Sequence, residues 1–180
     1  MFKKSVVPIS LAFLMALCLV PATAFAAEPA GENVQMAKSV KIEFLDHGPN
    51  PYSTNLSLLA KENPNYRTAI WTGKELQLTV MSIPKRGEVG LEIHEDTDQF
   101  FYVVEGSGTV LMGPQRDKLD YSMPVKKGSA IFIPLGTWHN IVNKGCGDLK
   151  LFTIYAPPHH PHGTVQKTKA IADAAATSAE

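Results

Sequence analysis

Short runs of apolar residues follow one another along the chain from Lys38 onward, separated by Gly, Pro, Asn and Asp. The runs are rich in Val, Ile, Phe, Tyr and Thr and recur about every 8 to 12 residues, a spacing typical of an antiparallel sandwich or barrel. They are VKIEFL, YRTAIWT, ELQLTVMSI, VGLEI, QFFYVVEG, GTVLMG, SAIFIP, HNIVN and DLKLFTIYA. The pattern therefore predicts an all-β fold.

Helical patterns are few in this sequence. The polar stretch between Phe44 and Asn65 predicts one short helix around residues 57–63 (SLLAKEN), and the alanine-rich end of the chain supports another through Ala175. Neither alternates with the strand runs as the helices of βαβ units do, so a doubly wound sheet is not expected.

The N-terminus has the pattern of a secretory signal peptide. Lys3 and Lys4 precede the apolar run VVPISLAFLMALCLVP, and the small residues Ala24 and Ala26 then form an A-x-A site. We expect cleavage after Ala26 and an exported product, in the periplasm or secreted. An uncleaved membrane anchor is the alternative, but the run is short for a spanning helix and contains two prolines.

Cleavage after residue 26 would leave 180 − 26 = 154 residues, the size of one compact domain. The mature chain would carry 15 basic and 17 acidic residues, a balance that favours neither nucleic acid nor an anionic membrane as partner. Cys146 would be its one cysteine, which excludes an intrachain disulfide. The expected parts after the signal peptide are an N-terminal extension (27–65), a barrel (66–158) and a C-terminal loop and tail (159–180).

The stretch GSAIFIPLGTWHNIVN, residues 128–143, carries the most specific motif. Five of its residues stand at spacings of six, two, three and four: Gly128, Pro134, Gly136, His139 and Asn143. This resembles the second motif of the cupin superfamily, G-x5-P-x-G-x2-H-x3-N, at every defined position. The resemblance implies a double-stranded β-helix, the cupin or jelly-roll barrel, in which His139 begins a strand with its ring facing inward.

The stretch GLEIHEDTDQFFYVVEG, residues 90–106, resembles the first cupin motif, G-x5-H-x-H-x3-4-E-x6-G, with departures. Glu92 stands where the first histidine is usual, His94 matches the second histidine, and Gln99 stands where glutamate is usual. The leading glycine is one place out. Glu92 and His94 are two residues apart on a predicted strand, so their side chains share one face. The resemblance implies a metal site formed by Glu92, His94, Gln99 and His139.

Both substitutions in the first motif keep a donor oxygen and a formal site charge of −1. Mixed nitrogen and oxygen donors suit one divalent metal ion, Mn, Fe, Zn or Ni, rather than a thiolate-binding metal. Four protein ligands would leave one or two places for water or substrate. The alternative is a buried hydrogen-bonded network without metal, although a carboxylate beside two histidines inside a barrel is costly unless its charge is balanced.

For the other candidate residues, packing or solvent exposure is a simpler interpretation than a role at the site. By alternation Phe101 and Val103 share the inward face of Gln99 and are expected in the core, and aromatic residues on strands pack more often than they line pockets. This packing interpretation applies to the aromatic residues Trp71, Trp138 and Tyr155. The acidic turn Glu95, Asp96 and Asp98 is expected to be solvated, with a rim base as the alternative, and Gln77 or Met81 could face the cavity.

The histidines of YAPPHHPHG, namely His159, His160 and His162, lie among prolines after the last expected strand. No regular strand or helix holds them at a fixed spacing. We therefore expect a surface or interface loop, with a second metal site as the alternative.

Residues 66–170 also look like a group of single-domain bacterial cupins described as resembling mannose-6-phosphate isomerase. The resemblance implies an enzyme that polarises a small oxygenated metabolite, such as a sugar or sugar acid, for isomerase, epimerase or lyase chemistry. An Fe-dependent dioxygenase and a non-catalytic small-molecule or metal-binding cupin stay open as alternatives, whereas a mere dimerising scaffold would leave the buried polar set unexplained. An unliganded acid or base beside the metal would favour an enzyme. Cupins often pair through edge strands, so a homodimer is expected.

Overall fold

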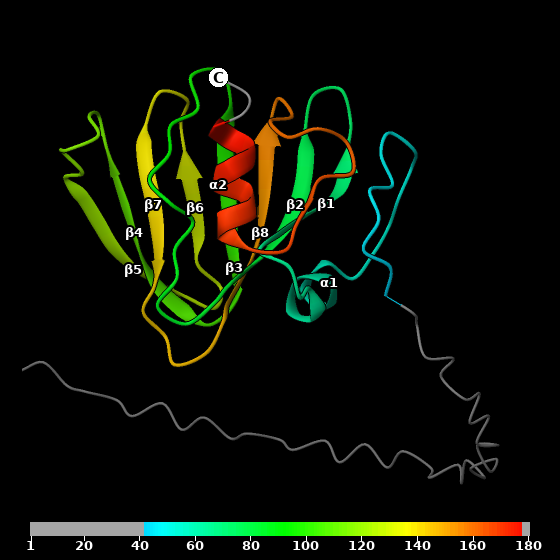
Figure 1. The fold of residues 1–180 in the computed structure, drawn as a ribbon, viewed down its shortest axis with the longest axis horizontal. Helices are drawn as coiled ribbons and strands as arrows, with labels where there is room; N and C mark the ends of the chain where they lie inside the picture. Colours follow the sequence, from blue (N-terminus) through cyan, green and yellow to red (C-terminus); the bar gives the residue numbers. More distant parts are fainter. Residues whose placement is uncertain (1–41, 178–180) are drawn as a thin grey trace, which may run out of the picture. The chain divides into compact units, whose positions relative to one another are not determined.

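The computed structural model describes residues 42–177 (Figure 1). The predicted signal peptide and its cleavage site lie outside this range, and the division of the chain at residues 26, 65 and 158 stays a prediction. The elements in chain order are α1 (Leu56–Glu62), β1 (Arg67–Thr72), β2 (Gln77–Ile83), β3 (Asp98–Glu105), β4 (Ser107–Gly113), β5 (Tyr121–Lys126), β6 (Ala130–Ile133), β7 (Trp138–Asn143), β8 (Leu149–Ala156), β9 (Val165–Gln166) and α2 (Lys169–Thr177).

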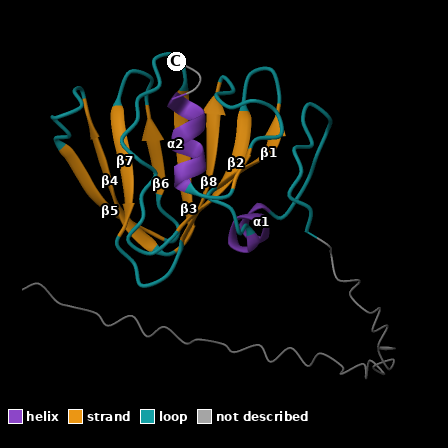
Figure 2. Ribbon diagram, viewed as in Figure 1, coloured by secondary structure: helices purple, strands orange, loops and turns teal. Residues whose placement is uncertain are grey.

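Two antiparallel sheets form the fold. One has six strands in the order β6-β3-β8-β2-β1-β9, and the other has three in the order β5-β4-β7. The segment before β3 adds to the smaller sheet through isolated bridges from Glu88 to Val142 and from Glu92 to His139. Within the described residues, helix is confined to the short segments α1 and α2 (Figure 2). The predicted all-β double-stranded β-helix is confirmed.

Alternation along the strands separates an inner face from an outer face. In β8 the buried residues recur at every second position, Leu149, Leu151, Thr153 and Tyr155. In β3 the inward residues Phe101 and Val103 are fully buried, as predicted. Each such apolar side chain contributes about 1.5–3 kcal/mol by leaving water, so this inner cluster is a main source of stability.

Helix α1 covers part of the outer face of the larger sheet. Its buried Leu59 and Ala60 pack in one cluster with Ile70, Val80 and Val104. The Asn55 side chain accepts a hydrogen bond from the Leu58 amide and caps the first turn. The short helix predicted around residues 57–63 is therefore confirmed. It buries part of the outer face of the sheet in a second apolar cluster.

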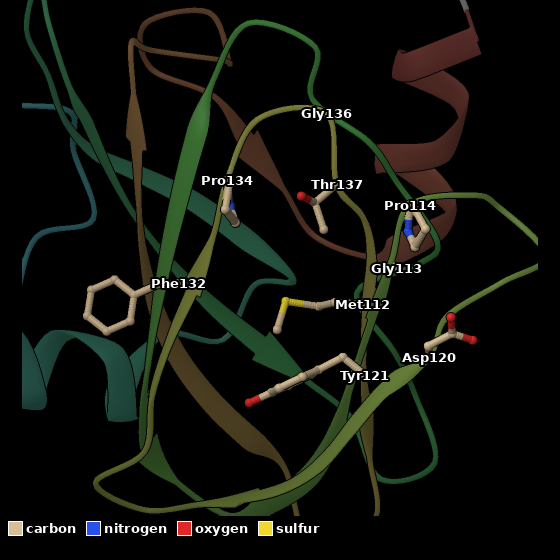
Figure 3. Close-up of a pocket in the computed structure, with 9 residues that line it drawn as sticks. All are labelled: Met112, Gly113, Pro114, Asp120, Tyr121, Phe132, Pro134, Gly136 and Thr137. Carbon is tan, nitrogen blue, oxygen red and sulfur yellow. The ribbon is translucent and has the colours of Figure 1, made fainter.

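A row of aromatic residues runs from the α1 cluster, against which Tyr102 and Phe152 pack, towards the edge strand β6. The Phe100 ring contacts the rings of Phe132 at 5.0 Å and Phe152 at 6.1 Å, and Phe152 stacks on Tyr102. Phe132 lies on the edge strand β6 and is 71% exposed. A pocket of about 430 Å³ opens beside it, with Tyr121 in its wall (Figure 3). An apolar surface of this kind is a candidate for protein contact.

Some strand predictions differ from the structure. The run VGLEI, expected to be a strand that carries Glu92, is no regular strand; the segment around it forms isolated bridges at Glu88 and Glu92. The run VKIEFL was expected to be a strand, but residues 42–45 form none, because β9 already pairs with the outer edge of β1. Ile42 and Phe44 instead pack beside the α1 cluster. Strand β5 was not predicted: Tyr121, Met123 and Val125 alternate as on a strand, but Pro124 interrupts the run and only Val125 is buried.

No helix in residues 42–177 is both long and apolar enough to span a bilayer.

Candidate metal centre

The bridge between the segment before β3 and β7 places Glu92 opposite His139. The Glu92 amide donates to the His139 carbonyl at 3.0 Å, and the His139 amide donates to the Glu92 carbonyl at 2.9 Å. Gly136, in the turn before β7, has φ of 71°, a conformation that favours glycine, and its amide donates to the His94 carbonyl at 2.7 Å. The second motif thus supplies His139 and also fixes the backbone that carries His94.

Three of the predicted ligand residues converge inside the barrel. Glu92 Oε1 lies 3.3 Å from His139 Nε2 and 3.5 Å from His94 Nε2, and the three donor atoms lie within 4.8 Å of one another. The side chain of His139 is 1% exposed and that of His94 is 5% exposed. The Glu92 side chain is 26% exposed, so a small molecule can reach the cluster from the side on which Glu92 lies.

The tautomer of His139 makes this cluster suitable for a cation. Its Nδ1 lies 2.8 Å from the carbonyl oxygen of Thr137, which can only accept, so Nδ1 carries the proton that joins them. In the neutral ring Nε2 is then a lone-pair acceptor directed at the Glu92 oxygen, which is another acceptor. Two acceptors 3.3 Å apart are favourable only with a proton or a metal ion to neutralise them, and a backbone bond to the remote nitrogen is the usual support of a metal-binding histidine.

Glu92 is ionised in this setting. Burial by itself raises the pKa of its carboxyl, but the nearby ring nitrogens of His139 and His94 and the charge of Arg67 outweigh burial and hold the pKa far below its ordinary range. A permanent carboxylate is the charged oxygen donor that the predicted ligand set requires.

Gln99 occupies the inner face of β3, as predicted, and is 3% exposed. Neither atom of its side-chain amide has a hydrogen-bond partner among residues 42–177, and both nitrogens of the His94 ring are likewise unpartnered. Buried polar atoms rarely stay unpaired, so these groups fit a bound ion or ligand. No hydrogen bond within that range joins Gln99 to the other three residues, and the four-ligand set stays a prediction.

The loop after β8 crosses the mouth of the cluster. The ring of His159 lies 4.1 Å from the ring of His94 and stacks against Tyr155 at 5.6 Å. The His160 amide donates to the Gln77 Oε1, and the Gln77 Nε2 donates to the His160 carbonyl, at 2.9 and 2.8 Å. His162 is turned away and contacts the Gly48 carbonyl. A surface loop was predicted for these histidines, but the contact of His159 with the site was missed.

The remaining candidate residues have mostly structural places. The turn residues Glu95, Asp96 and Asp98 are exposed, Met81 lies in the inner core and Cys146 is an exposed free thiol. The Trp71 indole donates to the Asn50 carbonyl, and Trp138 has Arg116 over its ring at 5.6 Å. Tyr155 was expected only to pack in the core. It is wholly buried, but its ring also lies edge-on to the ring of His94 at the candidate site. Its pairing with Gln99 across β3 and β8 is the signal that would have placed it at the site.

A carboxylate and two imidazoles that converge inside a β-barrel define a candidate metal-binding barrel. Residues 79–155 match the Cupin_2 family, described as a cupin domain. The chain belongs to the cupin superfamily. The finer likeness to mannose-6-phosphate isomerase-like cupins stays a prediction.

Three comparisons give the extent of the similarity. The chain is 49% identical over 130 residues to the uncharacterized protein YrkC of Bacillus subtilis, which covers 72% of this chain and 70% of YrkC. It is 37% identical over 115 residues to an uncharacterized protein of Acanthamoeba polyphaga mimivirus, with 63% and 70% covered. The crystal structure of BH2720 from Bacillus halodurans superposes with a TM-score of 0.72 at 52% identity and covers 72% of this chain and 98% of its own. These names state no activity, so the function has to be argued from the site.

Proposed function

We propose that the protein is an exported, metal-dependent cupin enzyme that acts on a small oxygenated metabolite such as a sugar or sugar acid. The observation that carries the proposal is the pair of acceptors formed by Glu92 Oε1 and His139 Nε2, 3.3 Å apart, with the unpartnered His94 ring beside them. Glu92, His94 and His139 would hold the ion, with Gln99 as the fourth ligand. A divalent ion bound there supplies Lewis acidity towards a carbonyl or hydroxyl oxygen.

His159 supports an enzyme over a mere binding protein. Its ring lies against His94, and it makes no side-chain hydrogen bond within residues 42–177 that would commit it to a structural role. The residue is exposed to solvent, and partial burial of its ring with the neighbouring His94 lowers the pKa of His159, which favours the neutral imidazole that can accept a proton. A base held beside the ligand cluster suits proton transfer next to a carbonyl, the step that isomerases, epimerases and many lyases share.

A homodimer is part of the proposal. The aromatic row of Phe100, Phe132, Phe152 and Tyr102 leaves an apolar surface on the outer sheet face, next to the edge strand β6. A second copy of the chain is the partner that this surface would take, because self-complementary sheet faces form symmetric dimers.

Metal content tests the ligand set. Protein purified from its exported compartment without chelator or affinity metal should contain about one Mn, Fe, Zn or Ni ion per chain by elemental analysis. The variant His139→Ala should lose the ion, and Glu92→Gln should weaken its binding by at least about 10- to 100-fold, the loss that follows removal of even an outer-shell partner of a metal ligand. The control His162→Ala should retain it, since that ring points away from the cluster.

Turnover separates an enzyme from a binding protein. The metal-loaded protein is incubated in D₂O with a panel of aldoses, ketoses and uronic acids, and NMR detects deuterium entering the position next to the carbonyl. We expect exchange with at least one compound, and loss of that exchange with retained metal in His159→Gln. Protein that refuses all four metals contradicts the proposal. Protein that holds a metal but exchanges no proton would be a binding cupin instead.

A further inference from the structure

Beyond the ligand cluster, the inner wall of the larger sheet carries buried polar side chains that its hydrogen bonds do not satisfy. The atoms without a partner among residues 42–177 include the Nε of Arg67, the hydroxyl oxygens of Thr79, Thr153 and Tyr155, and the amide of Gln99. Strand pairing places these residues on one continuous surface, with Gln99 opposite Tyr155 and Thr79 opposite Thr153. Such a density of unpaired buried groups is unusual and points to a ligand.

Arg67 is the most informative member of this surface. It is 4% exposed and is the one lysine or arginine among the buried residues of the described range. Its guanidinium has five N–H donors, yet one side-chain hydrogen bond is formed, from Nη1 to the Gln166 Oε1 at 2.9 Å. The rest of the group lies over the Tyr66 ring and beside the Tyr155 hydroxyl.

Tyr155 adds a second donor next to the guanidinium. Its hydroxyl is wholly buried, and a phenolic O–H, protonated at neutral pH, can donate a hydrogen bond. It approaches Arg67 and Gln99 but makes no hydrogen bond of good geometry with either in the described part of the chain. Arg67 Nε–H and Tyr155 O–H are therefore two adjacent donors in need of an acceptor.

Charge balance indicates what that acceptor is. The charges of Arg67 and Glu92 cancel, and a divalent ion at the cluster would add positive charge to a buried site, which favours an anion. With one arginine and one neutral hydroxyl, the wall matches a planar monoanion better than a phosphate dianion. A carboxylate can accept hydrogen bonds from the Arg67 guanidinium and from the Tyr155 hydroxyl at the same time.

We propose that Arg67 and Tyr155 bind the carboxylate of the substrate, so that the protein acts on a small carboxylic acid. The inference rests on the proposed function and narrows its substrate class from oxygenated metabolites to acids. The Arg67 guanidinium binds the carboxylate end of the substrate at the inner wall. The carbonyl or hydroxyl to be activated then faces Glu92, His94 and His139.

The guanidinium can be observed directly by NMR. The chain has three arginines, Arg67, Arg86 and Arg116, of which the latter two are exposed, so the protected Nε–H signal belongs to Arg67 and is assigned by its loss in Arg67→Lys. Acetate serves as the smallest carboxylate and acetamide as its neutral analogue. Each is titrated into metal-free and Zn-loaded protein. We expect acetate to shift the Arg67 signal in both forms and acetamide to leave it unchanged.

Variants give the strength of the contact. Arg67→Gln should weaken acetate binding about 10- to 100-fold, as loss of a charged hydrogen-bond donor does, and Tyr155→Phe should weaken it about 5- to 10-fold. The matched controls Arg86→Lys and Arg116→Lys should bind acetate as the wild type does. If Arg67→Gln fails to fold, Tyr155→Phe and the wild-type signal carry the test.

The outcomes separate this inference from the proposed function. An Arg67 signal that acetate leaves in place in both forms, or acetate binding that survives the Arg67 and Tyr155 changes, overturns the inference even if the metal binds. Acetate binding at Arg67 in protein that takes up no metal would support the carboxylate site and contradict the proposed enzyme.

Discussion

At the scale of single residues, Asn143 shows how a motif position can serve the fold alone. Its side chain is 2% exposed, and its amide nitrogen lies within 3.1 Å of the carbonyl oxygens of Ile83, Pro84 and Gly147. Its amide oxygen accepts from the Gly145 amide at 2.9 Å. One side chain thus joins the end of β2 to the turn between β7 and β8.

Replacing Asn143 with leucine should lower the free energy of unfolding by about 2–4 kcal/mol, because two or three buried backbone groups lose their partner. Urea unfolding measures the change. Asn50→Ala, at an exposed asparagine, is the control and should change stability by less than about 0.5 kcal/mol. A loss of metal with unchanged stability in Asn143→Leu would show that the residue acts on the site rather than on the fold.

The motifs predicted residues whose positions depend on local spacing, and missed those brought in from far along the chain. His139 and Gln99 take the places that alternation and turn residues indicate, since each is set by its own strand. Arg67 and His159 reach the site from β1 and from the loop after β8, and their places depend on β2, which pairs with β1 on one side and with the distant β8 on the other. No local pattern encodes that pairing.

At the scale of elements, the loop of residues 157–163 is a hydrogen-bonded cover over the cluster. Gln77 holds it through two bonds with the backbone of His160, and the His160 ring packs edge-on against Tyr155 at 5.0 Å. Burial, with the charge of Arg67 and the neighbouring His159, lowers the pKa of His160 from 6.5 to about 2. The closed loop therefore holds His160 neutral.

Acid should open this loop. When the loop opens, His160 regains its ordinary pKa near 6.5, so below that pH the open form binds a proton that the closed form does not. Because the folded pKa is depressed, the closed form is unaffected above pH 6.5 and loses stability as the pH falls towards 2. Between pH 6.5 and 4.5 the opening constant should rise by up to about 100-fold, since each pH unit contributes a factor of ten.

Hydrogen exchange of the residue-160 amide, corrected for its intrinsic rate at each pH, reports this opening, with the amides of β8 as the internal reference. In His160→Gln most of the pH dependence should disappear. Gln77→Leu, which removes both bonds to the loop, should expose the amide at every pH. The explanation is wrong if His160→Gln keeps the wild-type pH dependence.

At the scale of the whole molecule, the outer face of the larger sheet has two different halves. Helix α1 covers one half with Leu59 and Ala60, whereas the half next to β6 presents Phe132 and Leu135, which are 71% and 53% exposed. An exposed edge strand beside an apolar surface favours association, and proteins usually cover such an edge or charge it. Within residues 42–177 neither a helix nor a charge blocks β6, whose sequence is AIFI.

Phe132→Glu should therefore convert the proposed homodimer to a monomer. A charge at the centre of an apolar contact loses both burial and packing, and we expect the dissociation constant to rise at least about 100-fold. Size-exclusion chromatography with light scattering at micromolar concentration measures the mass of each form. Val165→Glu places the same charge on an exposed apolar residue of β9, the opposite edge of the same sheet, and should leave the dimer intact. A wild-type monomer at these concentrations would contradict the proposal, and a dimer that only Val165→Glu disrupts would move the interface to the β9 edge.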